Sequence, residues 1–169
     1  MDPILDKARA AQNLLERIAH KIPGFKGYRE RELRRDADKL QREYLASLLE
    51  TAKRALNDVS AAATRSGSLD VINDIETARK RLDKVIARIR YADRGYSGFF
   101  DEIKVDETML ERVYQFDLGL LVGVEEIQLA AQQAASATEV TAAVRELTAR
   151  IDGLDARLAD REAILGGVK

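Results

Sequence analysis

Few residues of this chain have the chemistry of a reactive or metal-binding site. The sequence contains no cysteine and a single histidine, His20, which excludes thiolate nucleophiles, disulfides and most zinc or iron–sulfur sites. Glu16 lies one helical turn before His20, so the two side chains can pair electrostatically. Di-iron helical bundles need a glutamate three residues before the histidine, and Arg17 occupies that position. We therefore expect an exposed pair and no bound metal.

Turn segments supply the remaining candidates. The GFKG sequence at residues 24–27 precedes a predicted helix, but no strand comes before it and the spacing of a nucleotide-binding loop is absent. Arg90, Tyr96 and Asp101 could act together in a helical enzyme, yet no spacing requires it. The sequence therefore predicts a protein that is not an enzyme, with no catalytic residue and no cofactor.

Length and composition indicate one helical domain. The 169 residues are 46% hydrophobic and 34% charged, with only 2 prolines and 10 glycines, as is typical of helical proteins. The formal charge is -1, so no overall positive field favours nucleic acid as a partner. The longest apolar run, residues 118–124, is far shorter than the ~20 residues that span a bilayer, and the first residues do not resemble a signal peptide. We expect a cytoplasmic protein without transmembrane segments.

Apolar residues recur at steps of three and four along most of the chain, which predicts amphipathic helices. The breaks between them fall at Pro23, Gly67 and Gly95. Short connections favour antiparallel neighbours, so the expected fold is an elongated antiparallel up-and-down helical bundle. Residues 1–137 would form four bundle helices and residues 138–169 a C-terminal heptad helix that resembles a coiled coil. The predicted helices cover approximately residues 3–22, 28–65, 68–93, 106–137 and 138–165.

The C-terminal helix carries a narrow apolar seam, which charged residues flank and Arg161 interrupts. Narrow seams are typical of two-stranded coiled coils and also of grooves within a bundle. We expect a homo-oligomer held by this seam; the alternative is that the seam folds back into its own bundle. The residues expected to carry self-association are Val144, Leu147, Ile151, Leu154 and Leu158.

Aromatic and basic residues gather in and beside the first and third turns. If the first four helices alternate in direction, both turns lie at one end of the bundle. There, residues 21–35 hold six basic residues against two acidic ones, and residues 79–94 hold seven against two. Such residues are common in interface hot spots, which favours a docking surface; alternatively, the rings close the open end of the bundle. The residues expected to dock a partner are Phe25, Tyr28, Arg29, Arg31, Arg90, Tyr91, Arg94, Tyr96, Phe99 and Phe100.

Asp117 stands in the fourth predicted helix where the repeat requires an apolar side chain. The preferred explanation is that the apolar stripe is displaced toward Phe116 and Leu120. The alternative is a buried carboxylate, which would need an arginine or a tyrosine hydroxyl as partner, because burying an unpaired charge is costly. Gly119 and Gly123, one turn apart, are expected to allow close packing inside the bundle, with a self-association face as the alternative.

Two segments resemble paired blocks in small helical prokaryotic proteins whose activity is not characterised. They are IPGFKGYRERELRRDADK, at residues 22–39, and RYADRGYSGFFD, at residues 90–101. The likeness covers about 30 residues and implies a helical bundle in which the two turns belong together. It implies no activity, cofactor or site.

Together these patterns favour a non-enzymatic interaction or scaffold protein. We expect it to self-associate through its C-terminal helix and to dock a protein partner at the aromatic, basic end. The alternative is a peripheral membrane protein that binds anionic lipid surfaces with the same end, although four acidic residues between positions 101 and 107 oppose that attachment.

Overall fold

The structure, a computed structural model, describes residues 2–91 and 106–166, and in this part of the chain the regular elements are all helices. The predicted all-α bundle is therefore confirmed. The second helix begins later than predicted, after a single turn of 3-10 helix. The elements are α1 (Pro3–Lys21), η1 (Arg31–Leu33), α2 (Arg34–Ser66), α3 (Leu69–Arg90), α5 (Glu107–Ala134) and α6 (Val140–Gly166).

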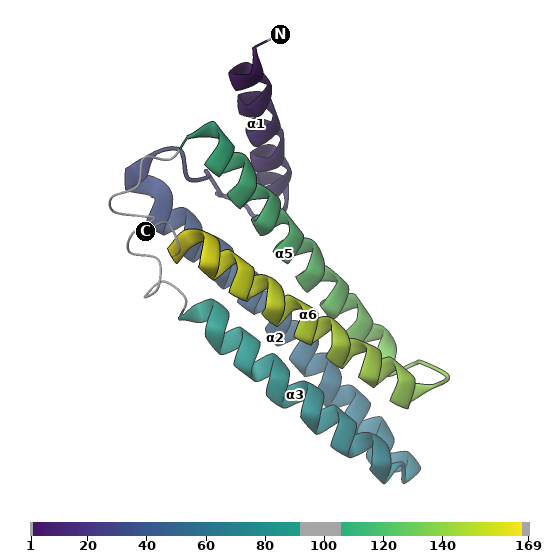
Figure 1. Ribbon diagram of the computed structural model, residues 1–169. Coiled ribbons are helices and arrows are strands. Elements are labelled where there is room, and N and C mark those ends of the chain that lie inside the picture. The colour runs from purple at the N-terminus through teal and green to yellow at the C-terminus, as the bar shows by residue number, and fades with distance from the viewer. Residues whose placement is uncertain (1, 92–105, 167–169) are drawn as a thin grey trace.

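Four of these helices, α2, α3, α5 and α6, form the bundle (Figure 1). Helices α2 and α3 make one antiparallel hairpin, and α5 and α6 make another. The hairpins pack side by side, with α2 along α5 and α3 along α6. Arg81 of α3 pairs with Asp152 of α6, and Arg88 pairs with Glu162 further along, so α3 and α6 run in the same direction. Neighbours within a hairpin are thus antiparallel, whereas neighbours between hairpins are parallel.

The core runs along the axis of the bundle, and each of the four helices contributes to it through its apolar stripe. Burying one leucine side chain contributes about 1.5–3 kcal/mol, so packing of these stripes supplies the main stabilisation. One fully buried leucine from each helix marks this core: Leu49, Leu82, Leu121 and Leu147.

Capping residues occupy the ends of several helices. The Asp2 side chain accepts a hydrogen bond from the backbone N–H of Ile4 at the start of α1. Asp106 does the same for the N–H of Met109 at the start of α5, at 2.8 Å. Gly67 ends α2 with a φ of 74°, a left-handed conformation that glycine adopts without strain.

Helix α1 lies outside the bundle and packs along α5 (Figure 1). Lys7 Nζ donates to Thr108 Oγ1 at 3.0 Å, and Lys21 Nζ lies 2.8 Å from Glu125 Oε1, so α1 and α5 run in the same direction. The expectation that the first four helices alternate in direction is therefore wrong for α1 and α2. Instead, residues 22–30, which we term the connector, lead the chain back toward the start of α5 before α2 begins.

Helix α6 belongs to the bundle, and its seam faces the interior. The seam packs against the other bundle helices of the same chain, so its expected role in self-association is corrected. The structure shows the alternative, in which the seam folds back into its own bundle. The expected division of the chain changes too, since the four-helix unit includes the C-terminal helix and leaves out α1. The five seam residues, each at most 5% exposed, are Val144, Leu147, Ile151, Leu154 and Leu158.

Candidate functional site

Six hydrogen-bonded polar side chains lie buried at the end of the bundle where α2 begins. They come from the connector, α2, α5 and α6, and none is more than 8% exposed. Charged groups are seldom buried unless they are paired, so this concentration marks the most unusual place in the described structure. We term it the buried ion cluster, and its members are Tyr28, Asp38, Gln41, Arg42, Asp117 and Arg161.

Arg161 of α6 is the centre of this cluster. Its Nε donates to Asp117 Oδ1 at 2.5 Å. Its Nη2 donates to Asp38 Oδ1 at 2.9 Å and to Gln41 Oε1 at 3.1 Å. The Tyr28 hydroxyl lies 2.6 Å from Asp117 Oδ2, to which it donates. A single arginine of α6 thereby holds α2 and α5 at once.

Arg42 extends the cluster to α3. Its Nε donates to Asp38 Oδ2 at 2.7 Å, and its Nη1 donates to the backbone carbonyl of Arg90 at 2.8 Å. The last carbonyls of a helix lack donors within the helix and carry partial negative charge. Arg42 therefore caps the C-terminal end of α3, and the cluster touches all four bundle helices.

The connector is anchored to α5 through Tyr28. Its ring stacks on the ring of Tyr114, with centroids 5.7 Å apart, and meets the Phe25 ring edge-on. Its backbone N–H donates to the Tyr114 hydroxyl at 2.9 Å. Gly27 makes this approach possible, because its φ is +80° and a Cβ there would overlap the Tyr114 hydroxyl.

The charges of the buried ion cluster balance, with two arginines and two aspartates. Burial raises the pKa of Tyr28, and the Asp117 carboxylate raises that pKa further, so the phenol stays neutral. Burial lowers the pKa of Arg161, but the attraction of Asp117 and Asp38 outweighs it and raises the pKa above its usual value. Both groups therefore keep one protonation state near neutral pH, which suits a role in holding the helices together.

Two of the predicted docking residues are core residues. Phe25 is 3% exposed and Tyr28 is fully buried. Their expected exposure to a partner is corrected, because both rings are buried: they meet edge-on, and the Tyr28 ring stacks on Tyr114 of α5. For these two residues the alternative, rings that close the end of the bundle, describes what they do.

Four other predicted docking residues, Arg29, Arg31, Arg90 and Tyr91, are exposed at this end of the bundle. Arg29 pairs with Glu107 at the start of α5 and lowers the pKa of that carboxyl through its hydrogen bonds. The predicted residues that lie outside the described part of the chain are Arg94, Tyr96, Phe99 and Phe100, together with Asp101.

The basic stretch of α3 does not form a free basic surface. Arg88 Nη2 lies 2.8 Å from Glu162 Oε2, and its Nη1 lies 2.7 Å from Asp155 Oδ1. The hydrogen bonds that Arg88 donates to the Glu162 and Asp155 carboxylates raise its pKa. Arg81 pairs with Asp152 in the same way. These arginines hold α3 against α6, and their charge is largely compensated.

The preferred explanation for Asp117, a displaced apolar stripe, is wrong. Asp117 is fully buried, and its partners are an arginine and a tyrosine hydroxyl, as the alternative required. Asp38 and Gln41 were missed altogether; the only signal in the sequence is that the apolar stripe of α2 changes register near Leu45. Arg161 was seen as an interruption of the seam, but its partner could not be read from the sequence.

The two glycines of α5 lie within the α5–α6 hairpin. Arg157 of α6 donates to the carbonyl oxygen of Gly119 at 3.1 Å. A Cβ on Gly123 would lie 3.2 Å from the same guanidinium group and 3.9 Å from Leu154. The Arg157 side chain thus lies across α5 at Gly119 and Gly123, which have no side chains of their own.

Comparisons with known proteins give no relative: no family model, no curated protein and no solved structure matches the chain. Within residues 2–91 and 106–166, none of the helices has both the length and the apolar character of a membrane span. In the same residues, no three histidine, aspartate or glutamate side chains are grouped so that they could hold a metal ion.

Proposed function

We propose that the protein is a non-enzymatic interaction protein that docks an acidic segment of a protein partner at the basic end of its bundle. The supporting surface is a shallow groove between the first turns of α2 and the end of α3, which we term the α2–α3 groove. The observation that carries the proposal is Tyr91, which is 68% exposed directly after Arg90. The groove is lined by Lys39, Arg42, Glu43 and Arg90.

Tyrosine and arginine are the residue types most often found in interface hot spots, because each combines a large contact area with hydrogen bonding. Among the aromatic residues that the structure describes at this end of the bundle, Phe25, Tyr28 and Tyr114 are buried, whereas Tyr91 remains in solvent. A partner that covers this residue would bury apolar area and could bind the hydroxyl. The neighbouring arginine would offer a charged donor to the same partner.

Ion pairs around the α2–α3 groove are easy to replace. Lys39 Nζ lies 3.9 Å from Glu43 Oε1, and both side chains are more than 60% exposed. Arg90 pairs with Glu50 at 3.0 Å, also in contact with solvent. Exposed pairs contribute at most about 1 kcal/mol, so carboxylates of a partner can replace these acids at little cost. Positive charge also predominates in the stretch that leads into α2, since residues 26–43 hold seven basic residues against five acidic ones.

The floor of the groove is rigid. Arg42 is 8% exposed and is held by Asp38 and by the backbone carbonyl of Arg90. A partner that docks there does not have to order this side chain, which lowers the entropic cost of binding. The buried ion cluster therefore supports the proposed surface from below.

Site-specific photo-cross-linking in the cells that make the protein tests this proposal. A photoreactive phenylalanine analogue replaces Tyr91 in one variant and Leu129 in the control, because Leu129 is also exposed, at 54%, but lies on α5. We expect a discrete protein adduct from position 91 that the control lacks. We also expect Lys39→Glu, placed in the same cross-linking chain, to reduce that adduct at least threefold. Equal adducts from both positions, or none from position 91, would contradict the proposal.

A lipid surface is the competing outcome. The chain is sedimented with anionic vesicles of phosphatidylserine and phosphatidylcholine at low and high salt. We expect no salt-sensitive binding, because Tyr91 and Lys39 are assigned to a protein partner. Vesicle binding that falls with salt and with Lys39→Glu would replace the protein partner by a membrane surface.

A further inference from the structure

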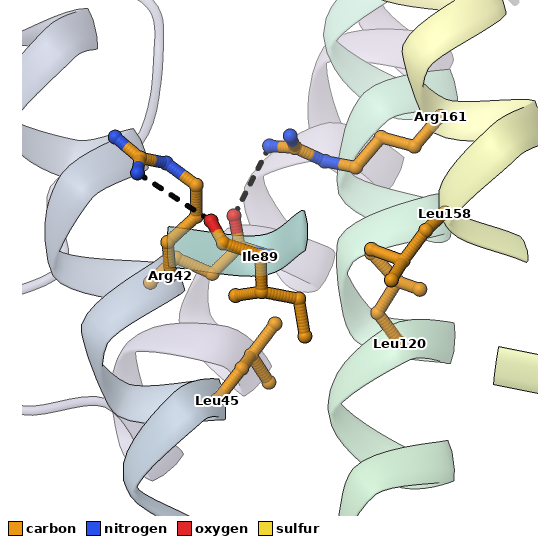
Figure 2. A pocket seen from close by; sticks show the side chains of 7 residues that line it. Arg42, Leu45, Ile89, Leu120, Leu158 and Arg161 are labelled. Carbon is orange, nitrogen blue, oxygen red and sulfur yellow. Dashed lines mark hydrogen bonds between the residues drawn. The ribbon is translucent and has the colours of Figure 1, made fainter. Parts of the chain in front are cut away.

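A small, partly open cavity lies between the bundle helices next to the buried ion cluster. Figure 2 shows the guanidinium groups of Arg42 and Arg161 at one end and the side chains of Leu45 and Leu120 toward the other. The centre of a water-sized sphere can occupy about 10 Å³ of this cavity. This volume is close to the minimum that holds one water molecule. The walls are formed by Gln41, Arg42, Leu45, Ile89, Leu120, Leu158 and Arg161.

One wall of this cavity carries a buried donor. Gln41 is 1% exposed, and its Nε2 has no hydrogen-bond partner among the described residues. Buried amide donors in proteins are almost always paired, either with protein or with an ordered water. The Nε2 group therefore needs an acceptor that these residues do not supply.

Rotating the Gln41 amide does not solve the problem. Its Oε1 accepts from Arg161 Nη2 at 3.1 Å and lies 2.9 Å from the Tyr28 hydroxyl. A flip would bring the amide NH₂ against the guanidinium NH₂ of Arg161, so two donors would face each other. It would also leave a buried oxygen where the nitrogen had been. The orientation of the amide is thus fixed by Arg161.

We propose that this cavity binds one structural water molecule, which accepts a hydrogen bond from Gln41 Nε2. Ile89 lines the same cavity, and its carbonyl oxygen accepts from Arg42 at only 3.5 Å. That oxygen keeps capacity for a second, shorter bond, which a water molecule can donate. In this proposal the water accepts from Gln41 of α2 and donates to Ile89 of α3, which adds a second link between these helices to the one that Arg42 makes.

Other occupants fit less well. An inorganic anion would bring an uncompensated charge into a cluster whose two arginines already face two aspartates, and the centre of a water-sized sphere has only about 10 Å³ available. Cavities that stay dry are apolar on all sides, whereas this one has an unpaired amide donor in its wall.

Solution NMR of the unmodified chain tests the proposal. The side-chain NH₂ signals of Gln41 should show a magnetisation-transfer peak to water, with the opposite signs of NOE and ROE that mark a long-lived buried molecule. The NH₂ group of Gln12, which is exposed on α1, serves as the control and should show no such signature. A Gln41 side-chain amide without the peak would overturn the proposal.

A matched pair of variants gives a second readout. Water-¹⁷O relaxation dispersion counts long-lived internal waters, and we expect Gln41→Met to lower the count by one relative to Gln12→Met. An unchanged count in a folded Gln41→Met variant would contradict the proposal. If that variant does not fold, the measurement on the unmodified chain decides by itself.

Discussion

Arg161 and Asp117 lie on opposite helices of the α5–α6 hairpin, and the arginine Nε donates to the aspartate Oδ1 at 2.5 Å with both side chains buried. Each residue interrupts the apolar repeat of its own helix. The two interruptions compensate one another, because a buried charge is tolerated when an opposite charge and hydrogen bonds accompany it. The pair therefore fixes the register in which α6 packs on α5.

The Tyr28 hydroxyl is expected to matter for stability. Tyr28→Phe leaves the ring stacking in place but removes the hydrogen bond to Asp117, so we expect a loss of about 1–3 kcal/mol in the free energy of unfolding. Urea denaturation measures this change. Tyr91→Phe is the control, since Tyr91 is exposed, and it should change stability by no more than about 0.5 kcal/mol. Equal effects of the two substitutions would contradict the assignment.

Alkaline pH should destabilise the protein through the same residue. Burial holds the pKa of Tyr28 well above its ordinary value, so the folded chain keeps the phenol neutral while the unfolded chain ionises it above pH ~10. Stability is then fully present below pH ~10 and falls as pH rises, by up to about 1.4 kcal/mol per pH unit. Urea denaturation between about pH 9 and 11 should show a shallower fall for Tyr28→Phe than for Tyr91→Phe. Parallel curves would refute the expectation.

Gly27 is predicted to be irreplaceable for a steric reason. Gly27→Ala combines a positive φ with an overlap of the new Cβ and the Tyr114 hydroxyl. Gly67→Ala is a matched control, because Gly67 also has a positive φ, of 74°, but open space around it. We expect the control to cost about 1 kcal/mol and Gly27→Ala to cost at least twice as much, measured as free energies of unfolding. Similar losses would show that contact with Tyr114 is unimportant.

The seam of α6 can be tested by introducing a charge. Leu154 is 3% exposed within the bundle, so Leu154→Asp should destabilise the protein by at least about 3 kcal/mol. This corresponds to a fall in Tm of roughly 6 °C or more for a chain of this size. Ala159→Asp, at an exposed position of the same helix, should have little effect. Analytical ultracentrifugation should give an unchanged mass for both variants, whereas a mass reduced only by Leu154→Asp would restore the seam as a subunit interface.

Helix positions were largely predictable from the sequence because they depend on local signals. Asp2 and Asp106 cap the starts of α1 and α5 with their side chains, as aspartate often does. Gly67 ends α2 because glycine adopts the left-handed conformation without strain. The spacing of apolar residues also identified the buried face of α6, although it could not say what that face packs against. An apolar stripe indicates that one face of a helix is buried, whereas the element that packs against this face depends on the whole fold.

The direction of α1 and the buried ion cluster could not be predicted, since both depend on contacts between distant residues. The connector reverses the chain because Gly24 and Gly27 adopt positive φ angles and Tyr28 finds a hydrogen-bond partner in α5. A pattern read along one helix at a time indicates a turn there but not its path. Similarly, the sequence does not distinguish Asp38 from the other polar residues of α2, because its partner Arg161 lies on α6.

A double-mutant cycle on Arg161 and Asp117 tests most directly whether the buried ion cluster holds the bundle. We expect Arg161→Met and Asp117→Leu each to cost about 3–5 kcal/mol in urea denaturation, because each leaves an uncompensated buried charge. The double variant should lose clearly less than the sum of the two. The cycle on Arg150 and Glu126, an exposed pair between the same helices, should give a coupling below about 1 kcal/mol. A coupling between Arg161 and Asp117 no larger than that of the exposed pair would contradict the account.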